Sequence, residues 1–383
     1  MSPFIGTDVL IVGGGIVGGS AALALRRKGL QVVLVERDFC GSRSSGINFG
    51  GVRRQGRPLS QLPLAQRAHE IWGRLGEHIG IDGEYQRCGH LKLARTEAEM
   101  QALVQYEQRT QGHGLGLEII GQNALRQRFP GLGADVVGGS LCPEDGQANP
   151  RLVAPAFARA ARALGAQVFE QSAMRSVAFD GSRFVVETAQ GLTIKAEVVL
   201  NSAGAWSGGL AAQFGDTVDM VSRHPSMAVT EPLPFMLPWS LGVEGGNIYC
   251  RQVARGNLVF GGGLGQAVDA DRARAQSATL LSQFSRIAQI VPAFAGASVL
   301  RTWSGAEGYL PDKLPVMGAS RHQPGLFHAF GFAGAGFQIG PAVGEVMAEL
   351  IATGSTSTPI DAFSLQRFPA PSPSKGLPHD HST

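Results

Sequence analysis

Three glycines near the start of the chain have the spacing needed to bring a phosphate group close to the backbone. Gly13, Gly15 and Gly18 follow an apolar run at residues 9–12. In such a Gly-x-Gly-x-x-Gly turn the glycines permit a sharp turn, close approach of a pyrophosphate and close packing of helix on strand. The start of the following helix adds free N–H groups and partial positive charge. We therefore expect this turn to bind a dinucleotide.

An acidic residue at the end of the next strand completes the pattern. Residues 31–35 form a second apolar run, and Glu36 follows it, eighteen positions after Gly18. A carboxylate at this place accepts hydrogen bonds from ribose hydroxyls. Because it favours an unphosphorylated ribose, the pattern predicts FAD or NAD rather than NADP.

A polar loop at residues 37–58 comes directly after this acid. It is rich in Gly, Ser, Asn and Arg, which makes it too polar for a core element. An ordinary surface loop is one reading. The other is that it lies beside the cofactor, where its hydroxyl, amide and backbone N–H groups suit a dinucleotide.

Two later stretches predict further contacts with the same sheet. Residues 197–206 read as a buried strand that ends in small residues, with Ala203 and Gly204 permitting close approach. Residues 326–340 read as a strand followed by a glycine-rich turn, and a helix is expected to open at Pro341. A second glycine turn so late in the chain favours a flavin over a nicotinamide. Its N–H groups would stabilise the negative charge of a reduced flavin ring.

The intervening segments predict the elements that position these turns. Asn149 and Pro150 begin a helix as N-cap and first residue, although Pro155 should disturb its second turn. Trp72 and His90 are expected to be structural. Apolar spacing predicts helices at 64–79, 97–111 and 275–290, a loop and short helix at 118–129, and strands at 83–93, 136–141, 227–230, 247–250 and 258–261.

The composition excludes several classes of protein. The 383 residues are 44% hydrophobic and 16% charged with a net charge of +3, which indicates a globular chain and disfavours nucleic-acid binding. Four widely spaced cysteines and nine histidines without ligand spacing predict no disulfide framework and no metal.

We expect a cytoplasmic protein, with the inner membrane face as an alternative. Residues 9–25 carry no charge, but no basic segment precedes them, which disfavours a signal peptide or membrane span.

With these motifs the chain resembles the D-amino-acid oxidase superfamily of FAD-dependent amine oxidoreductases. The resemblance runs from Asp8 to about Ala352. Within the superfamily the sequence is similar to sarcosine oxidase and to the catalytic subunits of bacterial D-hydroxyproline, proline, opine and glycine dehydrogenases. The matching segments are residues 13–18 with Glu36, 44–53, 201–206, Trp303-Ser304-Gly305 with Pro311-Asp312, and 331–337.

The resemblance implies an α/β fold in which a Rossmann-like FAD-binding domain is interleaved with a mixed-sheet α+β substrate domain. The FAD-binding domain comprises residues 1–82, 144–216 and 300–365, the substrate domain 83–143 and 217–299, and residues 366–383 form a disordered tail. The FAD is expected to be noncovalent, because no cysteine stands where sarcosine oxidase links its flavin. The expected cofactor-binding residues are Gly13, Gly15, Ile16, Val17, Gly18, Glu36, Arg37, Ser44, Ser45, Asn48, Gly50, Gly51, Ala203, Gly204, Trp206, Gly305, Gly334, Gly336, Phe337 and Gln338.

The resemblance also implies oxidation of a Cα–N bond in a D- or N-substituted amino acid, including cyclic ones such as D-hydroxyproline. In such a reaction a hydride would pass from Cα to flavin N5, and no general base would be obligatory. Arg53 is the first candidate to hold the substrate carboxylate. Alternatively, Arg53 or Arg54 pairs with an FAD phosphate or a surface acid. Tyr249 and Arg251 alternate on one strand and would share a face, either toward the substrate or toward solvent.

Two departures from related enzymes affect the expected substrate. Glu307 stands where glycine oxidase has a carboxylate-binding arginine, and it could attract an ammonium, orient a hydroxyl or be a paired structural acid. Gln338 stands where sarcosine oxidase has a lysine, and it is expected to donate a hydrogen bond near the flavin. Both changes favour the hydroxyproline- or proline-type dehydrogenases.

Two other functions stay open at this point. The chain could be the flavin-binding catalytic subunit of a heteromeric amino-acid or opine dehydrogenase that needs partner chains. Its electron acceptor would be oxygen, a quinone or a carrier. A nicotinamide dehydrogenase is disfavoured by the second glycine turn.

Overall fold

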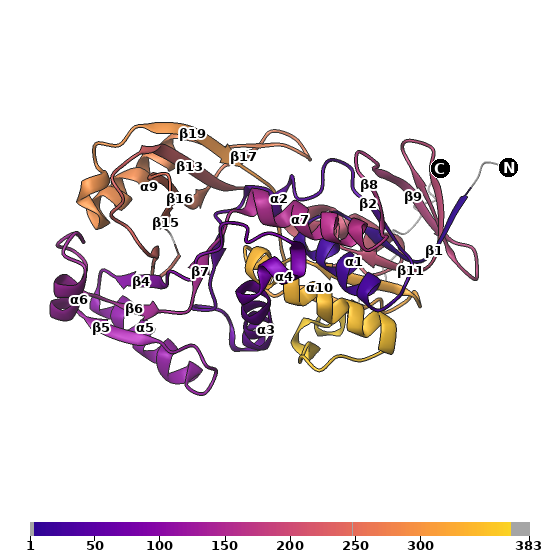
Figure 1. Ribbon diagram of the computed structural model, residues 1–383, viewed down its shortest axis with the longest axis horizontal. Helices are drawn as coiled ribbons and strands as arrows, with labels where there is room; N and C mark the ends of the chain where they lie inside the picture. Colours follow the sequence, from indigo (N-terminus) through magenta and orange to yellow (C-terminus); the bar gives the residue numbers. More distant parts are fainter. Residues whose placement is uncertain (1–3, 247, 369–383) are drawn as a thin grey trace, which may run out of the picture.

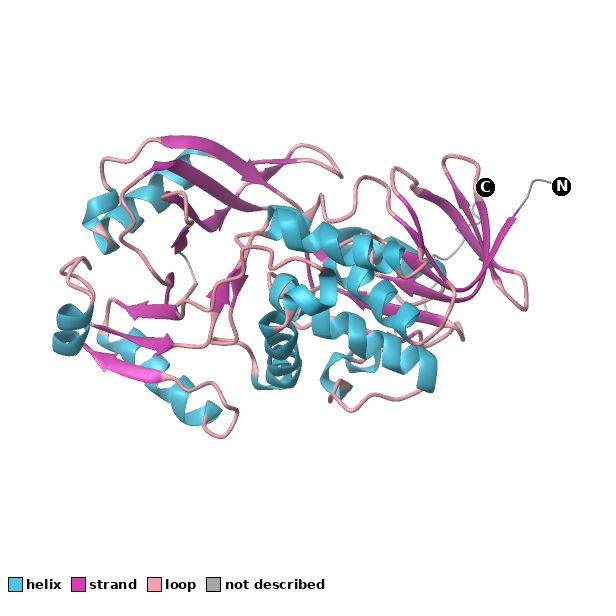
Figure 2. Ribbon diagram, in the orientation of Figure 1, coloured by secondary structure: helices cyan, strands magenta, loops and turns pink. Residues whose placement is uncertain are grey.

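A computed structural model describes residues 4–246 and 248–368. The chain forms two lobes along its long axis, each built on one large sheet (Figure 1). Helices lie against the sheet in the first lobe, and further helices flank the sheet of the second lobe (Figure 2). The predicted α/β class with a second, mixed-sheet lobe is confirmed.

The sheet of the first lobe is mostly parallel. β1 pairs in parallel with β2 and β11, and β22 pairs in parallel with β11. Strands buried on both faces read as unbroken apolar runs, which explains the sequence of residues 9–12. The strands in spatial order are β21 (Val316–Ala319), β22 (Leu326–Phe330), β11 (Thr193–Asn201), β1 (Phe4–Val12), β2 (Val32–Val35) and β8 (Gln167–Phe169), with β10 (Phe184–Thr188) and β9 (Met174–Phe179) extending from β11.

Helices from distant parts of the chain cover this sheet. Gly344 lies in α10 (Gly336–Thr353) and Ala21 in α1 (Ile16–Arg27). A Cβ added at Gly344 would lie 2.5 Å from the amide nitrogen of Ala21, so the backbones of these two helices are in contact. Ser20 Oγ donates a 2.9 Å hydrogen bond to the carbonyl of Pro341. The glycine turns at the two ends of the chain therefore lie side by side. The helices of this lobe are α1 (Ile16–Arg27), α2 (Ser44–Ile47), α3 (Leu62–Gly73), α4 (Leu75–Ile79), α7 (Pro150–Ala163), α8 (Ser207–Gln213) and α10 (Gly336–Thr353).

The sheet of the second lobe is mostly antiparallel, with β14 parallel to β4. Its apolar core is separate from that of the first lobe. Its strands in spatial order are β19 (Val299–Ser304), β13 (Pro225–Pro232), β16 (Asn257–Leu264), β15 (Tyr249–Gln252), β14 (Ser240–Val243), β4 (His90–Ala94), β6 (Gly138–Cys142) and β5 (Glu118–Gly121). Its helices are α5 (Glu97–Thr110), α6 (Gln122–Arg128) and α9 (Ser277–Ile290).

The part of the chain that the structure describes also contains three two-stranded ladders outside the large sheets. They are β3 (Gly51–Val52) with β7 (Gly146–Gln147), β12 (Val221–Arg223) with β20 (Glu307–Tyr309), and β17 (Gln266–Ala267) with β18 (Ala273–Arg274). Among the described residues, no helix combines the length and apolar character needed to cross a membrane.

Most predicted elements are present, but several boundaries were wrong. The helix at 64–79 breaks at Arg74 into α3 and α4, and the strand at 83–93 is confined to β4. The segment 118–121, expected as a loop, is strand β5. Pro155 lies inside a continuous α7, and Pro341 lies inside α10, which begins five residues earlier than expected. Asn247 and residues 369–383, part of one predicted strand and most of the predicted tail, lie outside the described residues.

Candidate cofactor and substrate site

The main cavity of the first lobe is lined by segments that are hundreds of residues apart. Its volume is about 450 Å³, within the range typical of ligand sites. It opens at the carboxyl ends of β1, β2 and β11, the edge where open parallel sheets bind ligands. The predicted cofactor-binding residues that line it are Gly13, Gly15, Ile16, Val17, Glu36, Arg37, Ser44, Ser45, Asn48, Ala203, Gly204, Trp206, Gly334, Gly336 and Phe337.

The first glycine turn is enforced by backbone contacts. Gly13 has a φ of +107°, and a Cβ there would lie 2.5 Å from the carbonyl oxygen of Ser202 on the neighbouring strand. A Cβ on Gly18 would lie 2.0 Å from the carbonyl oxygen of Gly13, so Gly18 serves helix-on-strand packing and does not line the cavity. Neither turn residue tolerates a side chain, and the backbone is left open to a phosphate.

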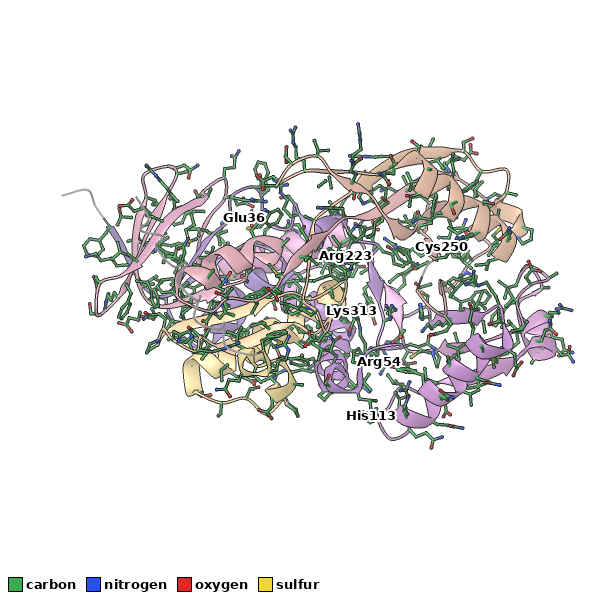
Figure 3. The ribbon with its side chains drawn as sticks, turned by 180° about the vertical axis from the view of Figure 1, so that it is seen from behind. Glu36, Arg54, His113, Arg223, Cys250 and Lys313 are labelled. Atoms are coloured by element: carbon green, nitrogen blue, oxygen red, sulfur yellow. The ribbon has the colours of Figure 1, made fainter. Side chains whose placement is uncertain are left out.

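Glu36 is buried at the end of β2, with 8% of its surface exposed. Its Oε2 accepts a 2.7 Å hydrogen bond from the amide of Gly14, and Oε1 accepts one of 2.8 Å from the amide of Asp38. A carboxylate has about four acceptor positions, so further positions stay open to hydroxyl groups. Seen from behind, Glu36 lies in the first lobe, Cys250 in the second, and Arg223 between them (Figure 3).

The N-terminus of α10 faces the same cavity. Gly336 and Phe337 line it, and the first turn of α10 contains no acidic residue. The N-terminus of α1 likewise has no acidic residue in its first turn, although Ser45 Oγ accepts the amide of Ile16. Two helix N-termini thus direct partial positive charge toward one cavity, an arrangement that suits an anion at each.

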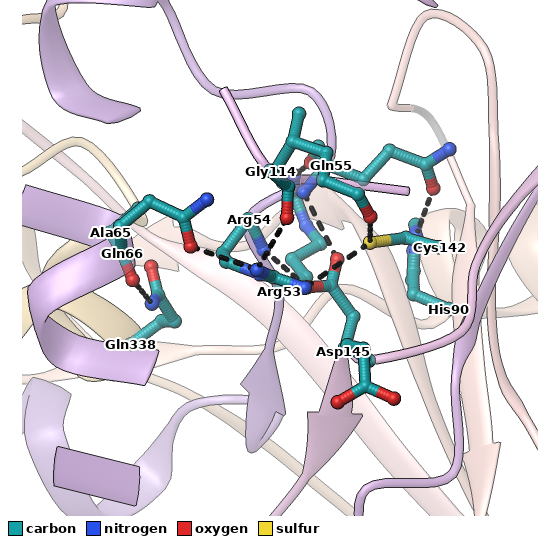
Figure 4. Close-up of polar contacts among 12 residues, drawn as sticks. Arg53, Arg54, Gln55, Ala65, Gln66, His90, Gly114, Cys142, Asp145 and Gln338 are labelled. Atoms are coloured by element: carbon teal, nitrogen blue, oxygen red, sulfur yellow. Dashed lines mark hydrogen bonds and ion pairs between the residues drawn. The ribbon is translucent and has the colours of Figure 1, made fainter. Parts of the chain in front are cut away.

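Five predicted cofactor residues do not line the cavity. Gly18, Gly50, Gly51 and Gly305 instead permit close packing; a Cβ on Gly305, for example, would lie 1.9 Å from Ile47 Cδ1. Gln338 was predicted to lie beside the cofactor, and this prediction was wrong. Because α10 begins at Gly336, its first turn directs Gln338 toward α3, where Nε2 donates a 3.0 Å hydrogen bond to the carbonyl of Ala65 (Figure 4).

The two neighbouring arginines after the polar loop have different environments. Arg54 is buried and bonds Asp145 Oδ1 at 3.1 Å, so it has a buried partner rather than the surface acid considered from the sequence (Figure 4). Arg53 Nη1 donates to the carbonyl of Gln55 at 2.5 Å, and among the described residues no carboxylate lies within ion-pair distance of it. Burial lowers the pKa of Arg53, although the group stays protonated at neutral pH.

Tyr249 and Arg251 share a face of β15 and both contact Phe49. The ring centroids of Tyr249 and Phe49 are 4.7 Å apart, and Arg251 Nε donates a 2.6 Å hydrogen bond to the carbonyl of Phe49. Arg251 is 7% exposed, which contradicts the solvent-facing alternative. Burial lowers its pKa to about 10. Because its Nε is bonded to the loop at Phe49, we assign Arg251 to support of that loop.

Glu307 lies on the wall of the cavity, in β20. Its Oε2 accepts a 3.2 Å hydrogen bond from the hydroxyl of Tyr309, and the described residues offer it no ion-pair partner. Burial raises its pKa to about 6. The pKa of Tyr249 is raised chiefly by burial and then by the Glu307 carboxylate, while Arg53 acts in the opposite direction. Tyr249 thus feels both a carboxylate and a guanidinium cation, although neither Tyr249 nor Arg53 lines the cavity.

The sequence reasoning missed part of the cavity wall. Ser172, Ala173 and Met174 line it after β8, the strand parallel to β2, and Arg43 and Gln213 line it from other segments. A prediction that β8 pairs in parallel with β2 would have placed residues 172–174 at the cavity, because the carboxyl ends of parallel strands meet at one edge of a sheet. No cysteine is among the described residues that line the cavity.

Comparison with known proteins agrees with this geometry. A family model described as "FAD dependent oxidoreductase" matches residues 8–350. The chain is 29% identical over 369 residues to glycine oxidase of Geobacillus kaustophilus, covering 94% of this chain and 97% of that protein. It is 28% identical to an opine oxidase subunit from Rhizobium meliloti, covering 95% and 98%. The crystal structure of L-proline dehydrogenase from P. horikoshii superposes with a TM-score of 0.89 at 26% identity, covering 96% and 98%.

Proposed function

The chain belongs to the family of FAD-dependent oxidoreductases, and on this premise we propose that it oxidises the Cα–N bond of a D- or N-substituted amino acid, cyclic ones included. The family acts on amino-acid and amine C–N bonds, as the glycine oxidase and opine oxidase relatives illustrate. We further propose that the FAD-binding domain comprises residues 1–82, 144–216 and 300–365, and the substrate domain 83–143 and 217–299.

The cavity of the first lobe fits FAD. Gly13, with a φ of +107° and no room for a Cβ beside Ser202, makes the tight turn that brings the backbone close to a pyrophosphate, and Glu36 retains acceptor positions for ribose hydroxyls. The start of α10, at Gly336 and Phe337, would stabilise negative charge on the ring system. Bound FAD supplies the electron acceptor for amine oxidation. The absence of cysteine from the described lining supports noncovalent binding.

The observation that carries the substrate proposal is a guanidinium cation, Arg53, and a carboxylate, Glu307, neither of which has an ion-pair partner among the described residues. Arg53, without a carboxylate partner among the described residues, would bind the substrate carboxylate. Glu307, half-buried on the cavity wall, would bind the substrate ammonium and, when ionised, accept one proton from it. This transfer breaks an N–H bond, forms an O–H bond and leaves the neutral amine that oxidation requires.

A substrate panel tests this proposal. We expect D-proline, D-hydroxyproline or another N-substituted amino acid to bleach the flavin absorbance of the holoprotein without oxygen, and the corresponding amines without a carboxylate to react far more slowly. A panel in which no amino acid reduces the flavin would exclude the substrate class.

A catalytic subunit of a heteromeric dehydrogenase is the second candidate. The similarity to an opine oxidase subunit over almost the whole chain favours it. Leu281 on α9 and Leu300 on the edge strand β19 are 71% and 63% exposed, as expected if a partner chain covers this part of the second lobe. Native mass measurement, with turnover on oxygen compared with artificial acceptors, separates the two candidates. A lone chain with full turnover would remove the need for a partner.

A further inference from the structure

A hairpin from the second lobe reaches the edge of the cofactor cavity. It consists of β17, β18 and the tip between them, residues 268–272. Asp271 Oδ1 accepts a 2.7 Å hydrogen bond from Arg37 Nη1, and the carbonyl of Asp271 accepts one of 2.6 Å from Arg43 Nη1. The carbonyl of Ala270 accepts a 3.1 Å hydrogen bond from Trp206 Nε1. Arg37, Arg43 and Trp206, the three donors, all line the cavity. The hairpin therefore contacts the cavity wall through these three side chains.

The tip of the hairpin is held in shape by its own contacts. Asp269 Oδ1 accepts the amides of Asp271 and Arg272 at 2.9 and 2.8 Å, and Asp269 Oδ2 accepts Arg272 Nε at 2.7 Å. The amide of Val268 donates to the carbonyl of Arg272 at 2.8 Å. The loop can therefore present the Ala270 and Asp271 acceptors with little loss of conformational freedom when they bind.

The three donors also contact one another. The guanidinium carbons of Arg37 and Arg43 lie 3.7 and 5.8 Å from the centroid of the Trp206 ring, and both arginines pair with Asp38 Oδ2, at 3.6 and 2.6 Å. Arg37 Nη2 is buried without a hydrogen-bond partner among the described residues. Protein atoms cover this nitrogen, and the guanidinium lies against the Trp206 ring, so Arg37 is packed into the cavity wall by Trp206 as well as held by Asp271.

We propose that the hairpin 266–274 is a clasp that retains FAD, with Asp271 as the positioning residue that holds Arg37 and Arg43 against the bound dinucleotide. Release of FAD requires Arg37, Arg43 and Trp206 to move, and their contacts with the second lobe oppose that movement. The clasp joins the two lobes at a place remote in sequence from the glycine turn. It slows dissociation and contributes nothing to the chemical step.

The test is the rate of FAD release from the holoprotein, followed by the recovery of flavin fluorescence after dilution. Asp271→Ala should release FAD about two- to fivefold faster, the effect of one exposed ion pair. Asp271→Glu should restore much of the slow release. Higher salt should accelerate release from the wild type and have less effect on Asp271→Ala, because the screened charge pair is already absent.

Glu197→Gln is the matched control, since Glu197 forms a comparable exposed ion pair with Arg183 at 2.9 Å, and it should leave release unchanged. Trp206→Phe keeps an aromatic ring at this position but removes the indole N–H that donates to the carbonyl of Ala270. In combination with Asp271→Ala it should accelerate FAD release further. Wild-type release rates in both Asp271→Ala and Trp206→Phe would overturn the clasp. No substrate is used, so the result is independent of the proposed amino-acid oxidation.

Discussion

The two halves of the proposed site would hold their ligands by different means. The cofactor half uses backbone amides, helix N-termini and glycines that leave no room for a Cβ, such as Gly13 and Gly18. The proposed substrate half has charged side chains with few partners, namely Arg53 and Glu307. A change in the first half should therefore act through steric exclusion and a change in the second through electrostatics. Their consequences for flavin content, stability and substrate affinity should differ accordingly.

The largest effect, loss of the cofactor together with a loss of stability, is expected in the cofactor half. Gly18→Val places a side chain where even a Cβ would lie 2.0 Å from the carbonyl of Gly13. Overpacking of this kind typically costs about 1–3 kcal/mol, and a rigid backbone partner makes relief difficult. We expect loss of bound flavin and a lower melting temperature, measured by absorbance and thermal unfolding. Gly6→Ala in β1, where nothing lies within 4 Å of the added Cβ, should keep both. Normal flavin content in Gly18→Val would contradict the packing argument.

The next effect concerns the buried ion pair between Asp145 and Arg54, the residue that follows Arg53 in the sequence. Asp145→Ala leaves Arg54 buried without its partner and removes the acceptor of the Arg54 and Gln55 amides. Breaking a buried pair in this way typically costs about 3–5 kcal/mol. Urea unfolding measures the loss. Glu144→Ala removes the adjacent but exposed partner of Arg87 and should cost less than about 1 kcal/mol. Equal losses in the two variants would show that burial is not the cause.

A smaller effect is expected at Arg53. Arg53→Ala should weaken binding of a substrate carboxylate by about 10- to 100-fold, since a hydrogen bond to a charged group contributes about 1.5–3 kcal/mol. Flavin content should not change, because Arg53 does not line the cofactor cavity. The dependence of flavin reduction on substrate concentration measures the affinity. Arg286→Ala, on the exposed face of α9, is the control. Unchanged affinity in Arg53→Ala would remove Arg53 from the substrate site.

The smallest effect is a pH dependence at Glu307. Its pKa is raised from 4.5 to about 6, so the folded protein binds this proton more tightly than the unfolded chain does. The resulting stabilisation is present below pH 4.5 and is lost as pH rises through 6. Glu307→Gln should lack this loss, and above pH 6 it should exceed the wild type in stability by at most about 2 kcal/mol. Urea midpoints between pH 4 and pH 8 test this. Parallel pH profiles of the two proteins would contradict a half-buried Glu307 that has no ion-pair partner among the described residues.

Much of the cofactor half could be predicted because its signals are local. The spacing of Gly13, Gly15 and Gly18, with Glu36 at the end of the next strand, defines one strand–turn–helix–strand unit. The late glycine segment required only that its strand join the same sheet, and β22 does so beside β11. Similar logic gave the N-cap at Asn149, whose Oδ1 accepts the amide of Arg151 at 3.1 Å.

The remainder depends on contacts that no local pattern contains. The pairing of Arg54 with Asp145 joins residues 91 positions apart, and the contact of Arg37 with Asp271 joins residues 234 apart. The start of α10 was predicted at Pro341 because proline favours a first turn, whereas packing against α1 extends the helix back to Gly336. That shift turned Gln338 away from the cavity and toward α3.

The central claim is that the chain breaks a Cα–H bond of an amino acid against FAD held by its distant glycine turns. The most direct measurement is the rate of flavin bleaching without oxygen, with an N-substituted amino acid that carries either hydrogen or deuterium at Cα. We predict that the holoprotein bleaches with both and more slowly with the deuterated substrate. No bleaching, or identical rates when bond cleavage is isolated as the observed step, would contradict this claim.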